Sequence, residues 1–278
     1  MFNSLSNALE IVVRTDPGMV RGQNEDAVFA NPNQGYVILA DGMGGYNAGE
    51  VASGMATMFL SSELEAAFIA RAPHEIDSAT GELFAHRCIL DKVAMTNSAI
   101  YNMSESQAQY AGMGTTLVLA LFYDNQITVA HIGDSRVYRL RGDGFCAITR
   151  DHSLLQEQID SGLISPDDAR FSQNKNLVTR ALGVDAEVEA EVHDYPVHTG
   201  DIYLLCSDGL NDMVEDEEIR LTLQTLSANL ELAATQLIQM ANDNGGRDNV
   251  SVILVKILQD FPAERGWRSK FMTWLKVR

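Results

Sequence analysis

Short apolar runs rich in branched residues recur along the chain, and their length and composition predict β-strands. The runs that we expect to form strands are 10–14, 36–40, 115–122, 126–132, 136–140, 201–206 and 251–258. Two longer segments, about 49–70 and 81–105, lie between the second and third runs and predict two long helices. The residues expected on the buried face of the first helix are Val51, Met55, Met58, Phe59, Ala66 and Ile69.

The order of these elements carries information about the fold. The predicted strands come in clusters separated by blocks of helices, without a regular alternation of strand and helix. Such an order favours an α+β layered sandwich over a doubly wound parallel sheet. The polar segment 151–183, which contains Pro166 and two successive aspartates, predicts a helical excursion and is a candidate flap beside a functional site.

The last twenty residues, 259–278, differ from the rest of the chain in charge. They carry five basic residues against two acidic ones, a net charge of +3. Their large apolar side chains fall near helical spacing and predict a short basic amphipathic helix; these are Trp267, Phe271, Trp274 and Leu275. Such a stripe either packs back onto the domain or contacts a membrane, and we favour packing.

The composition of the chain limits the cellular compartments and the classes of partner that we expect. The 278 residues carry a net charge of −18, which argues against nucleic acid and anionic membranes as main partners because both require a basic surface. Three isolated cysteines, Cys88, Cys146 and Cys206, form no CxxC pair and indicate a reducing compartment. Neither a signal peptide nor an 18-residue apolar stretch is visible, so we expect a cytoplasmic protein without a spanning helix. We also expect a monomer.

Carboxylates recur beside glycines or small residues at the ends of the predicted strands. Five clusters share this pattern: Arg21-Gly-Gln-Asn-Glu25-Asp26, Asp41-Gly42-Met43-Gly44-Gly45, Gly133-Asp134-Ser135-Arg136, Ser207-Asp208-Gly209-Leu210 and Gly246-Arg247-Asp248-Asn249-Val250. Strand ends in a common sheet project side chains into one crevice, so these five groups are expected to converge.

Converging carboxylates repel one another unless a cation neutralises them. Oxygen ligands without clustered histidine or cysteine select Mg²⁺ or Mn²⁺ over zinc. Glycine beside a ligand lets the backbone approach the ion closely, because glycine has no Cβ. Two such ions about 3.5 to 4 Å apart can activate a water molecule and hold substrate oxygens. The pattern therefore indicates hydrolysis of a phosphate ester.

Each cluster also has a simpler interpretation. A single Asp-Gly pair is most often a turn, so Asp134, Asp208 and Asp248 could each be turn or cap residues. Arg21 could be a surface ion-pair partner of Glu25. The glycine run after Asp41 fits neither the dinucleotide fingerprint nor the P-loop pattern. The joint order of all five clusters is what favours a metal site.

That order resembles the metal-dependent, type 2C serine/threonine protein phosphatases in their bacterial form. Three further segments match the family: Thr15-Asp16-x-Gly18, Met113-Gly114-Thr115-Thr116 and Asp151-His152-Ser153. The resemblance covers about residues 10–258, which leaves 1–9 as an N-terminal extension and 259–278 as a tail. It implies a four-layer αββα sandwich, with two antiparallel sheets flanked by helices, and places a variable flap at 151–183.

The resemblance also implies roles for the clustered residues, with two or three Mn²⁺ or Mg²⁺ ions as cofactors. Asp41 would bridge two ions. The implied ligands around it are Asp208 and Asp248 on one ion, the Gly42 carbonyl and Glu25 on the other, and Asp134 with Asp208 on a weaker third. Arg21 would grip the substrate phosphate, while Asp26 and Asn249 lie beside the ligands. A hydroxide bridging the metals would attack phosphorus in line.

The chain departs from many eukaryotic relatives at Met43, where those proteins have a histidine. The general acid is therefore open, and we favour a metal-bound water over His152 or His131. The expected function is hydrolysis of phosphoserine and phosphothreonine in protein substrates, opposing a cognate bacterial serine/threonine kinase. Dephosphorylation of a stress-pathway regulator is a second possible role. The alternative from another class is a catalytically inactive member that acts as a regulatory binding module.

Overall fold

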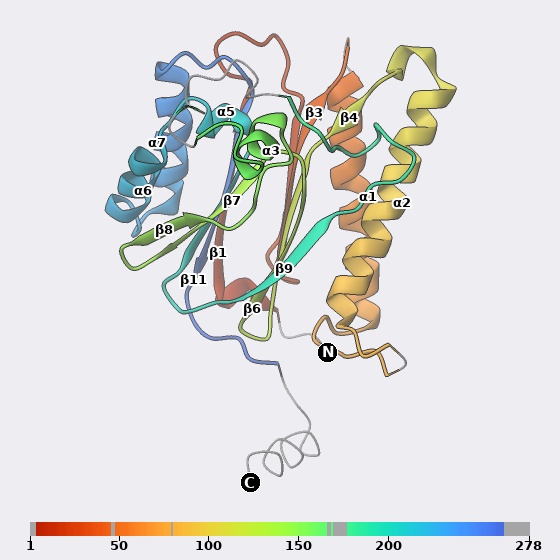
Figure 1. Cartoon of the computed structure of the whole chain (residues 1–278). Helices are drawn as coiled ribbons and strands as arrows, with labels where there is room; N and C mark the ends of the chain where they lie inside the picture. The colour runs from red at the N-terminus through yellow and green to blue at the C-terminus, as the bar shows by residue number, and fades with distance from the viewer. Residues whose placement is uncertain (1–3, 46–47, 79, 166–167, 169–176, 264–278) are drawn as a thin grey trace.

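Two antiparallel sheets pack face to face between two layers of helices in the computed structural model (Figure 1). The structure describes residues 4–263 except 46–47, 79, 166–167 and 169–176. One sheet has the strand order β1-β11-β10-β7-β8, and the other β2-β3-β5-β6-β9 with the short β4 beside β3. The expected αββα sandwich is thereby confirmed.

The strands are β1 (Leu9–Asp16), β2 (Asp26–Asn31), β3 (Tyr36–Met43), β4 (Gly114–Thr115), β5 (Leu117–Tyr123), β6 (Gln126–Ile132), β7 (Arg136–Arg141), β8 (Gly144–Ala147), β9 (Glu191–Pro196), β10 (Ile202–Cys206) and β11 (Val250–Ile257). The helices are α1 (Ala48–Ala70), α2 (Phe84–Ser106), α3 (Leu154–Asp160), α5 (Asp208–Asn211), α6 (Asp216–Thr225) and α7 (Leu230–Asp243). The helices α1 and α2 cover the sheet of β3, and α6 and α7 cover the sheet of β10 (Figure 1). The helix α3 lies in the predicted excursion at 151–183.

The central strands are buried on both faces. In β3, Tyr36 and Ile38 pack under α1 and α2, whereas Val37 and Leu39 point into the layer between the sheets. In β10, Leu205 meets the same inner layer. Full burial of one such aliphatic side chain stabilises the fold by about 1.5–3 kcal/mol. Two-sided burial produces the continuous apolar runs that made these strands predictable.

All seven predicted strands and both predicted helices are present, with ends shifted by a few residues. The predicted run 115–122 covers Thr115 of the short β4 and most of β5, and three strands had no prediction: β2, β8 and β9. These strands lie at sheet edges and are only partly buried or exposed, so their hydrophobic pattern is weak. The helices α6 and α7 also had no predicted range, although a Glu215–Glu218 capping box begins α6 and Asn229 caps α7.

The predicted buried face of α1 is wrong in part. Met58 and Ile69 are 64% and 73% exposed, and Phe59 and Ala66 are also exposed, whereas Val51 and Met55 are partly buried against the core. The side chains that face the sheet are Ala48, Ala52, Ala56, Leu60, Leu64 and Phe68. Small side chains in the first half of α1 let the helix approach β3 closely, so residue size alone misidentified the packed face.

This packing predicts that a substitution at Ala56 destabilises the fold, whereas one at the nearby Met58 is tolerated. Ala56→Leu should destabilise the protein by about 1–3 kcal/mol, because no space is left beside a fully buried alanine. Met58→Lys should change the free energy of unfolding by less than about 0.5 kcal/mol, since Met58 is exposed. Urea unfolding of the two variants measures both effects. An equal loss in the two would contradict the orientation of α1.

The chain still packs against the core just after β11, its last strand. Phe261 is 8% exposed in the core between the sheets, and its amide donates to Asn125 Oδ1 at 2.6 Å. The aromatic stripe predicted at Trp267, Phe271, Trp274 and Leu275 lies outside the described residues. Among the described helices, none is long and apolar enough to cross a membrane.

Candidate active site

The loop between β1 and β2 carries Arg21 and Glu25 and is held in place by Asn249. The Asn249 side-chain amide donates to the carbonyls of Pro17 and Gln23 at 3.0 and 2.9 Å, and its Oδ1 accepts from the Glu25 amide at 2.8 Å. Asn249 is 4% exposed, so these bonds are shielded from water. The residue predicted beside the ligands therefore positions the loop that presents Arg21 and Glu25.

Arg21 forms an ion pair with Asp248, which lies just before β11. Its Nη2 donates to Asp248 Oδ2 at 2.7 Å, and its side chain remains 51% exposed. The neighbouring Asp248 carboxylate raises the pKa of Arg21, so the guanidinium stays charged. A guanidinium has five N–H donors, and donors beyond the Asp248 bond can bind an anion.

Asp41 and Gly42 stand at the end of β3, next to the loop of Glu25. The Gly42 amide donates to the Glu25 carbonyl at 3.1 Å. A Cβ on Gly42 would lie 2.1 Å from the Gly49 carbonyl oxygen and 2.6 Å from that of Glu25, so only glycine fits here. The Thr116 hydroxyl accepts from the Asp41 amide, and the Thr116 amide donates to the Asp41 carbonyl. The backbone of Asp41 is thereby fixed from both sides.

Asp26 faces Asp41 across the β2–β3 ladder, where the two residues are register partners. The Ser207 hydroxyl donates to Asp26 Oδ2 at 2.8 Å, which joins β2 to the turn before Asp208. The other carboxyl oxygen, Asp26 Oδ1, is buried and has no hydrogen-bond partner among the described residues. Such an atom is suited to a bound water or ion.

Asp134 and Asp208 lie at two further strand ends. Asp134 sits in the turn between β6 and β7 and is 6% exposed, while Asp208 is the first residue of α5, directly after β10. The turn before Asp134 needs glycine, because Gly133 has a φ of +99° and lies against Thr116. Both aspartates influence the pKa of Asp41, which places them in the same electrostatic environment.

The pKa values of these carboxyls reflect their burial first and their mutual repulsion second. Burial raises the pKa of Asp26 and of Asp134 to about 6. The pKa values of Asp41 and Asp208 are raised well above their usual range, first by burial and then by the surrounding aspartates. Burial also raises the pKa of Glu25. The structure therefore brings the predicted carboxylates together in a site that favours a cation or protons.

Asp134 should consequently make the metal-free protein less stable as pH rises. Its pKa in the fold, about 6, lies above the ordinary value of 3.8, so its stabilising contribution is present below about pH 4 and lost through pH 6. In EDTA, the stability of the wild type relative to Asp134→Asn should fall by about 2 kcal/mol between pH 4 and 7. Urea unfolding at both pH values measures the difference. A difference independent of pH would contradict the buried position of this carboxyl.

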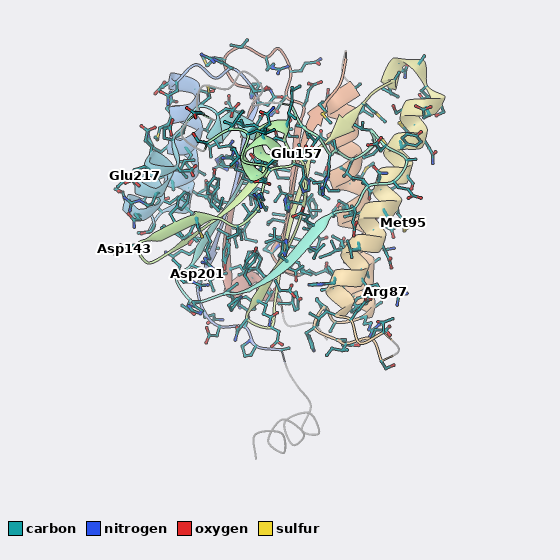
Figure 2. All side chains as sticks on the ribbon, viewed as in Figure 1. Arg87, Met95, Asp143, Glu157, Asp201 and Glu217 are labelled. Atoms are coloured by element: carbon teal, nitrogen blue, oxygen red, sulfur yellow. The ribbon has the colours of Figure 1, made fainter. Side chains whose placement is uncertain are left out.

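One acidic residue near the site was not predicted. Asp212 raises the pKa of both Asp134 and Asp208, so it lies close to them. The signal was present in the sequence, because Asp208 and Asp212 are four residues apart in Ser207-Asp208-Gly209-Leu210-Asn211-Asp212 and share a helix face. Other acidic residues, such as Asp143 and Glu217, lie exposed at the periphery (Figure 2).

The two histidines considered as general acids are already engaged elsewhere. His131 Nε2 lies 2.8 Å from the Arg150 carbonyl, and His152 Nδ1 accepts from the Gly133 amide at 3.2 Å. Both side chains are buried, and burial lowers their pKa values. Neither ring has a contact in the structure with Asp41 or Asp208, so the geometry does not favour either histidine as the proton donor.

Comparison with known proteins agrees with this arrangement. The family model described as protein phosphatase 2C matches residues 21–255. The serine/threonine phosphatase Stp of Listeria monocytogenes is 41% identical over 249 residues, covering 87% of this chain and 94% of that protein. The crystal structure of the Mycobacterium tuberculosis serine/threonine phosphatase PstP/Ppp superposes with a TM-score of 0.79 at 38% identity, covering 91% of this chain and all of that one.

A second crystal structure contains the catalytic domain of the serine/threonine protein phosphatase PstP in complex with two manganese ions. It has a TM-score of 0.77 and 38% identity, and the match covers 91% of this chain and 99% of that one. Sequence and fold thus agree over most of the chain. This protein belongs to the protein phosphatase 2C family.

Proposed function

We propose that this protein hydrolyses phosphoserine and phosphothreonine in protein substrates with the help of two or three Mn²⁺ or Mg²⁺ ions. The observation that carries the proposal is the group of aspartates around Asp41, whose pKa is raised first by burial and then by the repulsion of its neighbours. A site with so much converging negative charge becomes stable at neutral pH when divalent cations bind. Family membership and the manganese ions in the PstP catalytic domain support the same conclusion.

The residues present fit such ions. The donors are carboxylate and carbonyl oxygens, which hard divalent cations prefer. Asp26 Oδ1 is a buried acceptor without a partner among the described residues, and only glycine fits at position 42, against Gly49 and Glu25. We assign Asp41, Asp208 and Asp248 to one ion, Asp41, Glu25 and the Gly42 carbonyl to another, and Asp134 with Asp208 to a third. When bound, the ions would supply a nucleophile at neutral pH and neutralise charge on the phosphate.

The chain's own residues orient the substrate and the ligands. Arg21 binds the phosphate oxygens through its free donors, because its charge is permanent and its fork matches an oxyanion pair. Asn249 holds the loop that carries Arg21 and Glu25, so it sets their distance from Asp41. Asp26, joined to Ser207, orients water around the ligands. The leaving alkoxide takes its proton from solvent at the site, since His131 and His152 are engaged elsewhere.

The biological role that we propose is reversal of a serine/threonine kinase in the same cell. The proposal rests on membership of the protein phosphatase 2C family. A comparison of the phosphoproteome with and without the gene would identify substrates and kinase together. Unchanged phosphoserine and phosphothreonine levels would argue against this role.

Metal-dependent turnover tests the proposed activity. The purified protein should release phosphate from a phosphothreonine peptide and from p-nitrophenyl phosphate in Mn²⁺, and EDTA should abolish the release. Mn²⁺ titration by calorimetry provides the independent binding readout. A protein that binds no divalent ion and hydrolyses neither substrate would instead be the inactive regulatory module considered from the sequence.

A further inference from the structure

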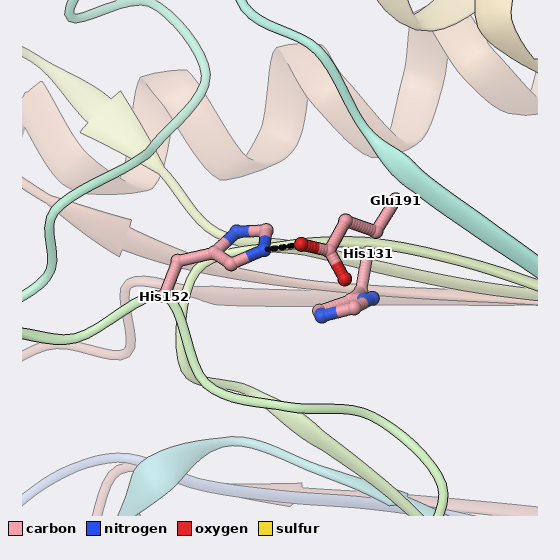
Figure 3. Close-up of side chains that lie close together, drawn as sticks. All are labelled: His131, His152 and Glu191. Atoms are coloured by element: carbon pink, nitrogen blue, oxygen red, sulfur yellow. Dashed lines mark ion pairs between the residues drawn. The ribbon is translucent and has the colours of Figure 1, made fainter. Parts of the chain in front are cut away.

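A cluster of three titratable side chains lies beside the candidate active site and has no part in the proposed reaction. His131 on β6, Glu191 on β9 and His152 have ligand-type atoms within 4.8 Å of one another (Figure 3). Both histidines are buried, at 1% and 6% exposure. Buried polar groups next to a partly exposed carboxylate call for a structural or chemical reason.

His152 connects the flap to the turn before Asp134. Its amide donates to the Gly133 carbonyl at 2.9 Å, and its ring Nδ1 accepts from the Gly133 amide at 3.2 Å. Since Nδ1 accepts a hydrogen bond, the ring proton is on Nε2. Nε2 lies 3.1 Å from Glu191 Oε1, a close polar contact without the alignment of a hydrogen bond. The neutral ring thus links Gly133 to Glu191 with a defined tautomer.

The segments 151–154 and 177–180, here called the flap base, are the two ends at which the flap joins the domain. They pair with each other: the Thr179 amide donates to the His152 carbonyl at 2.8 Å, and the Leu154 amide donates to the Leu177 carbonyl at 2.9 Å. Arg180 Nη1 lies 3.6 Å from Glu191 Oε1, the same oxygen that His152 contacts. One carboxylate therefore contacts both segments of the flap base.

His131 on β6 packs against the ring of His152. Its ring stacks on that of His152, with centroids 4.8 Å apart and planes inclined by 22°. Its Nε2 carries the proton, because it lies 2.8 Å from the Arg150 carbonyl, which can only accept. His131 is also the register partner of Glu191 across the β6–β9 ladder. The stacked histidine pair therefore lies next to β9, the edge strand of this sheet.

A metal ion is a poorer explanation of the cluster. A ligating nitrogen must be unprotonated, and the atom that His152 directs at Glu191 carries the ring proton. His131 Nδ1 and the carboxylate are therefore left as donors. His131 Nδ1, like His152 Nε2, has no hydrogen-bond partner among the described residues. Structural metal sites usually have four protein ligands and catalytic ones three. Two donors beside a protonated nitrogen fit a set of positioning contacts better than a metal site.

We propose that Glu191 is a positioning residue for the phosphatase site. It holds His152 and Arg180 of the flap base against β9, and through His152 it holds the Gly133 turn that presents Asp134. The consequence for Asp134 rests on the proposed function, since it assumes that this carboxylate binds a cation. The hold on the flap base and the Gly133 turn does not depend on that assumption.

The test compares Glu191→Ala with Glu191→Gln. Glutamine keeps an oxygen of the same reach next to His152 Nε2, so its behaviour should match the wild type within about twofold. Alanine removes this oxygen and should raise the Mn²⁺ concentration for half-maximal activity about tenfold, the scale seen when groups that orient metal ligands are lost. Glu189→Ala, at an exposed glutamate two residues before β9, is the matched control and should match the wild type.

Amide hydrogen exchange gives a readout that needs neither metal nor activity. Exchange at Gly133 and Thr179, whose amides donate to His152, should accelerate in Glu191→Ala and stay unchanged in Glu191→Gln. His152→Asn, which keeps an acceptor near the Gly133 amide but cannot reach Glu191, should match Glu191→Ala, and the double variant should add nothing further. Unaltered exchange in Glu191→Ala would overturn the proposal.

Two other outcomes separate this inference from its alternatives. Co²⁺ absorption bands that persist in Asp41→Asn but vanish in His131→Ala would show that the cluster is a metal site and would overturn the positioning role. Wild-type protein without Mn²⁺-dependent activity, but with accelerated exchange in Glu191→Ala, would refute the proposed function while supporting the hold on the flap base. Failure of the inference and failure of the function are thereby distinguishable.

Discussion

Asp208→Asn should lower Mn²⁺-dependent turnover of p-nitrophenyl phosphate on the order of a thousandfold at saturating Mn²⁺. Asp208, like Asp41, is assigned to two of the ions, and the amide of asparagine removes its charge without changing its size. The pKa of its carboxyl is raised by burial and by Asp134, Asp212 and Asp248. The substitution therefore removes a source of repulsion as well as a cation ligand.

The same substitution should leave the metal-free protein at least as stable as the wild type at pH 7. A loss of activity with retained stability excludes unfolding as the cause, and urea unfolding in EDTA measures this. Mn²⁺ should raise the melting temperature of the wild type and do so less in Asp208→Asn. Asp243→Asn, at an exposed position on α7, is the control and should keep full turnover. Activity that survives Asp208→Asn would refute the proposed metal-dependent mechanism.

Arg21→Ala should lower kcat/KM for aryl phosphates by about a hundredfold while Mn²⁺ still binds. The guanidinium donates to Asp248 and is half exposed, so it can turn its other donors toward a phosphate. Removing it takes away a phosphate contact but leaves every carboxylate in place. Arg21→Lys keeps the charge without the planar fork and should fall between the wild type and Arg21→Ala.

Product inhibition by inorganic phosphate checks this assignment directly. The inhibition constant should rise in Arg21→Ala together with KM, whereas the Mn²⁺ concentration for half-maximal activity should stay within a few-fold of the wild type. Arg14→Ala removes an exposed arginine of β1 that pairs with Glu231 on α7, and it serves as the control for a loss of positive charge. A large change in Mn²⁺ affinity without a change in phosphate inhibition would place Arg21 in the metal site instead.

The sequence predicted those elements whose burial leaves a strong pattern. Strands such as β5 and β10 are buried along their whole length and appear as continuous apolar runs. The edge strands β2, β8 and β9 have mixed patterns, because they are only partly buried or exposed, and these had no prediction; the edge strand β1 was predicted. The buried face of α1 was misjudged for a related reason: close packing on β3 selects small residues, which hydrophobicity underrates.

The candidate site shows the same division between local pattern and long-range contact. The aspartate-glycine motifs and their order were visible in the sequence, and so was the family. The contacts that hold Asn249 to Pro17 and Gln23, or Ser207 to Asp26, join residues at least 181 positions apart. Asp212 lies four residues after Asp208 in the sequence. It is recognised as part of the site only because the structure places it near Asp134.

What the sequence determined by itself was the chemistry: which oxygen donors are available, that they follow strand ends, and that no thiolate or histidine cluster accompanies them in the motifs. What only the tertiary structure decided was which groups share an environment. Repulsion among Asp26, Asp41, Asp134 and Asp208, and the contact of Glu191 with both segments of the flap base, arise from the packing of distant strands. The physical reason is that electrostatic and hydrogen-bond energies depend on distance in space, and distance along the chain does not reveal it.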